Sequence, residues 1–114
     1  MRSDSGDLLQ GTLGILILKA LLAEPAHGYG IARWVESATD DVLRIEEGSL
    51  YPALRRLEDK GWVRSEWGLS ENNRRARFYT ITSTGRGHLR SEAALWMRYS
   101  GAVTQVLRAA PSLA

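Results

Sequence analysis

The sequence predicts one mainly α-helical domain that carries a small β-hairpin, and three patterns in its 114 residues lead to this prediction. Three segments between residues 7 and 61 repeat their apolar residues at helical spacing. Two short stretches then alternate apolar and polar residues on either side of a polar loop, which indicates an antiparallel hairpin. A last segment returns to a seven-residue apolar repeat, which is typical of a helix that packs along another helix.

The composition excludes several classes of protein. Hydrophobic residues make up 44% of the chain, which indicates a folded domain. There is no cysteine, so disulfides, thiol nucleophiles and cysteine-based metal centres are excluded. The acidic N-terminus lacks the pattern of a signal peptide, and the apolar run at 13–18 is too short to cross a bilayer. We expect a soluble, cytoplasmic protein that needs neither a cofactor nor a membrane.

The first predicted helix, over residues 7–25, is apolar almost all the way round. Its leucines and isoleucines occupy too many positions for one narrow stripe, so most of its sides need cover. We expect a second subunit to supply part of this cover, with Leu9, Leu13 and Leu16 in the interface. The alternative is a monomer with this helix at its centre. Pro25 is expected to end the helix.

A second, shorter helix is predicted after the glycines at 28 and 30. Ile31, Trp34 and Val35 recur at helical spacing, and the acidic pair at 40–41 closes the segment. We interpret the tryptophan of this helix as a core residue rather than a ligand contact.

The third predicted helix begins near Gly48 or Ser49 and ends at Gly61. Leucines at 50, 54 and 57 fix the side that faces the core. Pro52 is tolerated in a first helical turn, because the backbone N–H there has no intrahelical acceptor, and Ser49 is a candidate N-cap. The opposite side of this helix carries Tyr51 and the arginine pair at 55–56.

The predicted hairpin joins strands at 62–68 and 76–83 through a polar loop, and Trp62 and Trp67 are interpreted as core or strand-face residues. A long helix follows from a cap at Ser83 or Thr84 and runs to Pro111. Its seam consists of Leu89, Trp96, Val103 and Ala110 at seven-residue spacing, with Tyr99 and Val106 as i+3 partners and Glu92 as an interruption. We assign Leu89, Trp96, Val103 and Val106 to a dimer interface.

The order of three helices, a hairpin and a long helix is that of a winged helix-turn-helix, in which a helix enters the major groove of DNA. The charges are uneven: residues 48–90 hold nine Arg or Lys and four acidic residues, whereas residues 1–47 hold four and eight. A single arginine pair also fits an ordinary solvated face, but basic side chains on two successive elements predict a surface for a polyanion. The candidate DNA-binding residues are Ser49, Tyr51, Pro52, Arg55, Arg56, Arg74, Arg75 and Arg77.

Three blocks of the chain resemble the PadR-type transcriptional regulators: LLQGTLGILILKALLAEPAHGYGIA, GSLYPALRRLEDKGWV and RRARFYTITSTGR. The resemblance covers about residues 8–90 and points to the short form with a single C-terminal helix. It implies a homodimeric DNA-binding protein, usually a repressor, whose first and last helices form the dimer. By the same resemblance, residues 49–52 head the recognition helix and the arginines at 74, 75 and 77 belong to the wing. Glu46 and Glu47 depart from the family pattern, because two carboxylates there would repel phosphate unless they turn away or pair with Arg44.

In some members of this family, aromatic residues of the last helix line a cavity between subunits that holds flat aromatic molecules. The resemblance therefore makes Trp96, Met97 and Tyr99 candidate effector-binding residues, with plain dimer packing as the alternative. His27 and His88 show no metal-ligand spacing and stand in no nucleophile signature, so we expect neither a metal site nor a catalytic residue.

From the sequence we expect residues 1–83 to form a winged helix-turn-helix DNA-binding domain and residues 84–114 to form a dimerisation helix. The expected function is transcriptional regulation, with repression by a homodimer on a palindromic double-stranded operator and release by a small aromatic molecule. The alternative is a winged-helix protein-interaction module that does not bind DNA directly.

Overall fold

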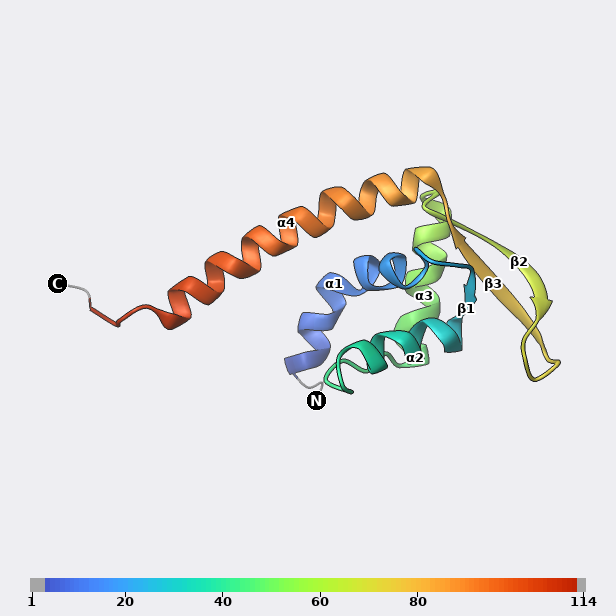
Figure 1. Ribbon diagram of the computed structural model, residues 1–114, viewed down its shortest axis with the longest axis horizontal. Helices are drawn as coiled ribbons and strands as arrows, with labels where there is room; N and C mark the ends of the chain where they lie inside the picture. Colours follow the sequence, from blue (N-terminus) through green and yellow to red (C-terminus); the bar gives the residue numbers. More distant parts are fainter. Residues whose placement is uncertain (1–3, 113–114) are drawn as a thin grey trace.

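The computed structural model describes the backbone of residues 4–112 and the side chains of residues 12–112. The described residues form, in order, α1 (Asp4–Ala20), β1 (Ala26–His27), α2 (Gly28–Ala38), α3 (Glu47–Asp59), β2 (Val63–Leu69), β3 (Arg75–Ile81) and α4 (Ser83–Arg108) (Figure 1). The mainly α-helical architecture with a β-hairpin is therefore confirmed. The hairpin extends from one end of the helical body, and most of α4 extends from the other.

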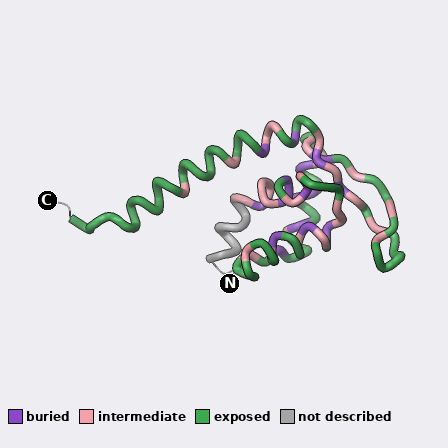
Figure 2. Tube along the Cα trace, in the orientation of Figure 1, coloured by how far each residue is buried: buried purple, intermediate pink, exposed green. Residues whose placement is uncertain are grey.

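The core lies among α1, α2, α3 and the beginning of α4, where the buried residues gather (Figure 2). Helix α1 contacts each of the other three helices and is therefore the central helix of the body. Leu13 and Leu89 are 2% and 7% exposed, so both belong to the core of a single chain, and their assignment to a dimer interface is corrected. Leu16 is half-buried against this core, and the side chain of Leu9 lies outside the described residues.

Helix α1 ends at Ala20, five residues before the proline that was expected to end it. The N–H groups of Leu21 and Leu22 donate to the carbonyls of Leu18 and Lys19, at 3.1 and 3.2 Å, and these i to i−3 bonds tighten the last turn. Leu21 is buried in the core. Buried apolar residues continue past the end of the helix, so a count of apolar positions does not reveal where it ends.

Strand β1 was not predicted. It pairs antiparallel with β3, Ala26 opposite Tyr79 and His27 opposite Phe78, so that the sheet has the order β1-β3-β2. His27 then caps α2, since its Nδ1 accepts a hydrogen bond from the N–H of Gly30 at 3.0 Å. Two residues are too few to show the alternation by which a strand is recognised.

Helix α3 begins at Glu47 with Glu46 as N-cap, so the assignment of Ser49 as N-cap is wrong. Pro52 is the sixth residue of the helix and lies in its second turn, not its first. Because proline has no N–H, the carbonyl of Gly48 receives no i+4 hydrogen bond from it. Gly48 is exposed, which leaves that carbonyl accessible to water. The glycine expected to end the helix, Gly61, lies beyond its C-cap in a left-handed conformation with φ of 78°.

Helix α4 begins one residue earlier than expected, because Thr82 rather than Ser83 or Thr84 is its N-cap. Thr82 Oγ1 accepts from the N–H of Gly85 at 3.0 Å and donates to the carbonyl of Gly61 at 2.7 Å. The helix ends at Arg108, so Ala110 lies beyond it and does not extend the predicted seam.

Past its first two turns, α4 leaves the body and its side chains are mostly exposed (Figures 1 and 2). The exposed set includes large apolar side chains that are 39% to 79% accessible: Leu95, Trp96, Met97, Tyr99, Val103, Val106 and Leu107. The first two turns, in contrast, contribute the buried Gly85 and Leu89. In space, the body therefore extends several residues past the boundary expected at residues 83–84.

Two glycines of α4 provide a matched test of this packing. A Cβ at Gly85 would lie 2.1 Å from the carbonyl oxygen of Trp62, whereas a Cβ at Gly101 would meet nothing within 4 Å. We expect Gly85→Ala to lower the free energy of unfolding by about 1–3 kcal/mol through overpacking. Gly101→Ala is expected to raise it by up to about 1 kcal/mol through helix propensity. Urea denaturation measures both, and shifts of the same sign would contradict the close contact.

Candidate nucleic-acid interface

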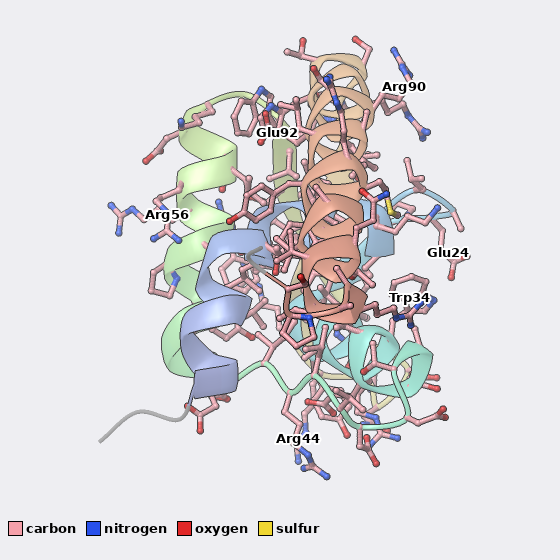
Figure 3. All side chains as sticks on the ribbon, turned by 90° about the vertical axis from the view of Figure 1, so that its left-hand side faces the viewer. Glu24, Trp34, Arg44, Arg56, Arg90 and Glu92 are labelled. Carbon is pink, nitrogen blue, oxygen red and sulfur yellow. The ribbon has the colours of Figure 1, made fainter. Side chains whose placement is uncertain are left out.

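Helix α3 divides into a buried and an exposed side. Leu50, Ala53, Leu54 and Leu57 are buried. The other side carries four exposed candidate residues, Tyr51, Pro52, Arg55 and Arg56, and the half-buried Ser49. Figure 3 shows Arg56 directed away from the body. Among the described residues the only ion pair joins Arg44 to Asp41, so no carboxylate of this part of the chain pairs with either arginine of α3.

Tyr51 connects α3 to the beginning of α2. A Cβ on Gly28, the first residue of α2, would lie 2.7 Å from the hydroxyl oxygen of Tyr51. The tyrosine ring thus covers a position that only glycine can occupy without moving it. Tyr51 is nevertheless 47% exposed, so its outer edge remains available at the front of α3.

The pKa of Tyr79, on β3, is influenced by residues of both α3 and the hairpin. Burial raises the pKa of Tyr79; the charge of Arg77 acts in the opposite direction, while those of Glu58 and Tyr51 raise it further. Residues of α3 and of β3 are therefore within electrostatic range of the same group. Hydrogen bonds link Glu58 of α3 through Ser65 of β2 to Arg77 of β3, so the exposed arginine of the hairpin is tied to α3.

The hairpin carries its arginines close to its tip. Arg74 lies in the turn and Arg75 begins β3, and both are exposed. The guanidinium carbons of Arg75 and Arg77 lie 4.7 and 5.4 Å from the ring centroid of Trp67, in the geometry of cation–π contacts. Trp67 is 55% exposed and stands on a strand, as expected.

Arg77 differs from the other two because it makes a hydrogen bond within the chain. Its Nε donates to Ser65 Oγ at 2.9 Å, and the same hydroxyl donates to Glu58 Oε2 at 2.8 Å. A serine hydroxyl can accept and donate at once, so Ser65 bridges the arginine to the carboxylate.

The carboxylates of Glu46 and Glu47 remain exposed at the beginning of α3. Arg44, which was considered as their partner, instead lies 3.9 Å from Asp41 and is directed away from the body (Figure 3). Glu47 occupies the first turn of α3, where the positive end of the helix dipole favours a negative charge.

Sequence reasoning missed two candidates on α2. Tyr29 and Arg33 are exposed, lie four residues apart, and the guanidinium carbon of Arg33 is 5.9 Å from the tyrosine ring centroid. Their i, i+4 spacing was a signal that could have identified them. Trp34 was expected in the core with Ile31 and Val35, but it is 46% exposed, and Figure 3 shows it on the outer side of α2.

The remaining aromatic and histidine residues have structural surroundings. Trp62 is half-buried and stacks on His88 with a centroid distance of 3.5 Å and an interplanar angle of 10°. On α4 the rings of Trp96 and Tyr99 are 6.4 Å apart, and Met97 beside them is exposed. No group of three His, Cys, Asp or Glu suited to a metal ion occurs among the described residues. Within the same part of the chain, no helix has the length and apolar character needed to cross a membrane.

Comparison with known proteins is consistent with this geometry. The model of the transcriptional regulator PadR-like family matches residues 17–91. A transcriptional regulator from Clostridium thermocellum is 28% identical with a TM-score of 0.78, over 87% of this chain and 96% of that one. A PadR family transcriptional regulator from Eggerthella lenta is 35% identical with a TM-score of 0.74, over 91% and 88%. An uncharacterized 37.1 kDa protein in transposon TN4556 from Streptomyces fradiae is 40% identical over 89 residues. The match covers 78% of this chain and 24% of that protein.

Proposed function

Since the chain belongs to the PadR-like family of transcriptional regulators, whose members are not enzymes, we propose that it is a cytoplasmic homodimeric repressor that binds a palindromic operator. The observation that carries the DNA-binding part is the continuity of one exposed face from α3 into the hairpin. Hydrogen bonds join Glu58 of α3 through Ser65 to Arg77 of the hairpin, and Tyr51 and Arg77 are both exposed. In the proposed division of labour, residues 1–83 bind DNA and residues 84–114 hold the dimer together.

In the proposed complex, the front of α3 enters the major groove and the hairpin lies along the adjacent backbone. Tyr51, Arg55 and Arg56 reach base edges or phosphates from α3, with Ser49 and Pro52 beside them at its front. Arg74, Arg75 and Arg77 extend the positive surface along the hairpin. Arginine suits this role because its planar donors match phosphate and guanine geometry.

Selection of bound duplexes from random DNA, followed by fluorescence anisotropy over a salt series, tests the DNA-binding proposal. We expect a palindrome with half-sites about one helical turn, roughly 34 Å, apart. Affinity is expected to fall steeply with salt, and Arg74→Ala should reduce the slope of log K against log salt by about 1.8, because each of the two subunits loses one phosphate contact. Lys19→Ala, on α1, is the control of equal charge and should leave the slope unchanged. A wild-type protein whose binding is indifferent to salt, or that binds only another protein, would instead support an interaction module.

The dimer proposal rests on the apolar face of α4. Trp96, Val103 and Leu107 follow one another along one side of a helix that protrudes from the body, and nothing in the same chain covers their part of the described helix. A contiguous exposed apolar surface of this kind marks an interaction site in soluble proteins. The seven-residue spacing of Trp96 and Val103 suits packing against the same helix of a second copy.

Val103→Glu is expected to convert the dimer to a monomer, because it places an unpaired charge in the apolar contact. Arg98→Glu is the matched control: it lies about 140° away round the helix and should leave the dimer intact. Sedimentation equilibrium measures both, with circular dichroism to verify that the variants fold. A dimer that survives Val103→Glu would overturn the assignment of this face.

We further propose that the dimer releases DNA when a small planar aromatic molecule binds between the subunits beside Trp96, Met97 and Tyr99. Aromatic rings from two copies would provide faces on which such a molecule stacks. A ligand that prefers one spacing of the two α4 helices would change the separation of the recognition helices and so alter DNA affinity. Plain packing of these side chains in the dimer is the alternative.

Tryptophan fluorescence tests the effector site with planar aromatic dyes as probes. We expect saturable quenching that is lost in Trp96→Ala but retained in Trp34→Phe, which removes a different exposed tryptophan. Saturation should also raise the operator dissociation constant by about 5- to 150-fold, the usual range of allosteric coupling. Equal quenching of the wild-type protein and Trp96→Ala would contradict the effector site and would leave Trp96 with a packing role alone.

A further inference from the structure

The three wing arginines have different surroundings in the folded chain. In the part of the chain that the structure describes, Arg74 and Arg75 donate no side-chain hydrogen bond, whereas Arg77 donates its Nε to Ser65. Arg75 shares the face of Trp67 with Arg77 but keeps all its donors. A side chain that already makes a hydrogen bond within the chain is less free to follow a phosphate.

The hydrogen bonds of Arg77 lead from the hairpin to α3. Its Nε donates to Ser65 Oγ on β2, and Ser65 Oγ donates to Glu58 Oε2 on α3. The bond from Ser65 to Glu58 is partly buried, whereas the bond from Arg77 to Ser65 is exposed. The guanidinium carbon of Arg77 also lies 5.4 Å from the ring centroid of Trp67, which stands directly across the ladder from it. The four side chains of Glu58, Ser65, Arg77 and Trp67, which we name the wing strut, thus span α3, β2 and β3.

We propose that Arg77 is a positioning residue of the DNA interface: the wing strut holds the hairpin at a fixed angle to α3, and Arg74 and Arg75 alone make the phosphate contacts of the wing. This inference rests on the proposed function.

The need for such a strut follows from the shape of the wing. Toward the tip of the hairpin, beyond Phe78, the sheet narrows from three strands to two, because β1 pairs only with residues 78 and 79 of β3. A two-stranded ribbon twists and bends easily, since it has no third strand or packed face to hold it. A hydrogen bond that ties β3 and β2 to α3 lies just where this support ends. This hydrogen bond also fixes the direction of the Arg75 side chain, because the guanidinium groups of Arg75 and Arg77 both lie over the ring of Trp67.

Lysine cannot replace Arg77 in this role. The strut needs a donor at Nε together with a flat cation against Trp67, and a lysine ammonium offers a compact charge on a flexible stem. A simple phosphate contact, in contrast, is largely preserved by lysine. Arg77→Lys therefore separates a positioning role from a contacting role.

The test measures anisotropy of a labelled duplex, obtained by selection with the wild-type protein, at several salt concentrations. We expect Ser65→Ala, Arg77→Ala and Arg77→Lys each to weaken binding by about tenfold, the scale of one hydrogen bond to a charged group, with the salt slope unchanged. Ser65→Thr retains the hydroxyl and should bind like wild type. The double variant Ser65→Ala with Arg77→Ala should be no weaker than either single variant, because both break the same strut. Arg75→Ala should instead lower the slope by about 1.8, because each subunit of the proposed dimer loses one phosphate contact.

Leu69→Ala is the matched control for the wing. This exposed residue shares a strand and a sheet face with Ser65 and Trp67 but does not belong to the strut. Its substitution should change affinity less than twofold. Full recovery by Arg77→Lys, or a salt slope lowered by Arg77→Ala as much as by Arg75→Ala, would overturn the proposal.

A measurement on the free protein tests the wing strut separately from DNA binding. In ¹⁵N spectra of the free protein, the Nε–H of Arg77 should exchange with water more slowly than that of the exposed Arg55, and Ser65→Ala should abolish the difference. Equal exchange in the wild-type protein would show that the strut does not form. If the exchange is slow but the protein binds no duplex, the strut forms and the DNA-binding proposal is wrong. The positioning role of Arg77 is then wrong as well.

Discussion

The contact between the beginning of α4 and the turn that follows α3 is the constraint on which the rest of the structure depends. Gly85 lies so close to the carbonyl of Trp62 that a side chain cannot be accommodated between them. Thr82 caps α4 and binds the carbonyl of Gly61, and His88 stacks on the ring of Trp62 one turn later. These contacts fix the direction in which α4 leaves the body, and they place the end of α3 against its base.

Because of this constraint, the wing and the beginning of α4 are attached to the same part of the helical body. A single residue, Thr82, separates β3 from α4, so the wing and the protruding helix are joined without a flexible linker. In the proposed dimer, the distance between two copies of α3 is therefore set by how the α4 helices pack. In that dimer, a change in the packing would reach α3 through Trp62 and Gly61, as the proposed coupling between the two sites requires.

The helix that is left without neighbours in a single chain is not the one that the sequence indicates. Helix α1 is so apolar that a partner subunit was expected to cover it, yet in its described part the apolar side chains are buried or half-buried within one chain. Helix α4 is less apolar but remains uncovered beyond Leu89. The strongest structural reason for a dimer thus lies in α4, because burial depends on which neighbours the fold supplies and not on hydrophobicity alone.

The sequence by itself determined the type and order of the main elements, because helical spacing and strand alternation are local properties of the chain. It also identified the exposed candidates of α3 and the wing, from their position opposite the leucines of α3 and around a polar loop. The tertiary structure decided what depends on distant partners: the strand that His27 forms with Phe78, the end of α1, and the exposure of Trp34. It also separated Arg77 from Arg74 and Arg75, since a hydrogen bond to Ser65 arises only when β2 and β3 pair beside α3.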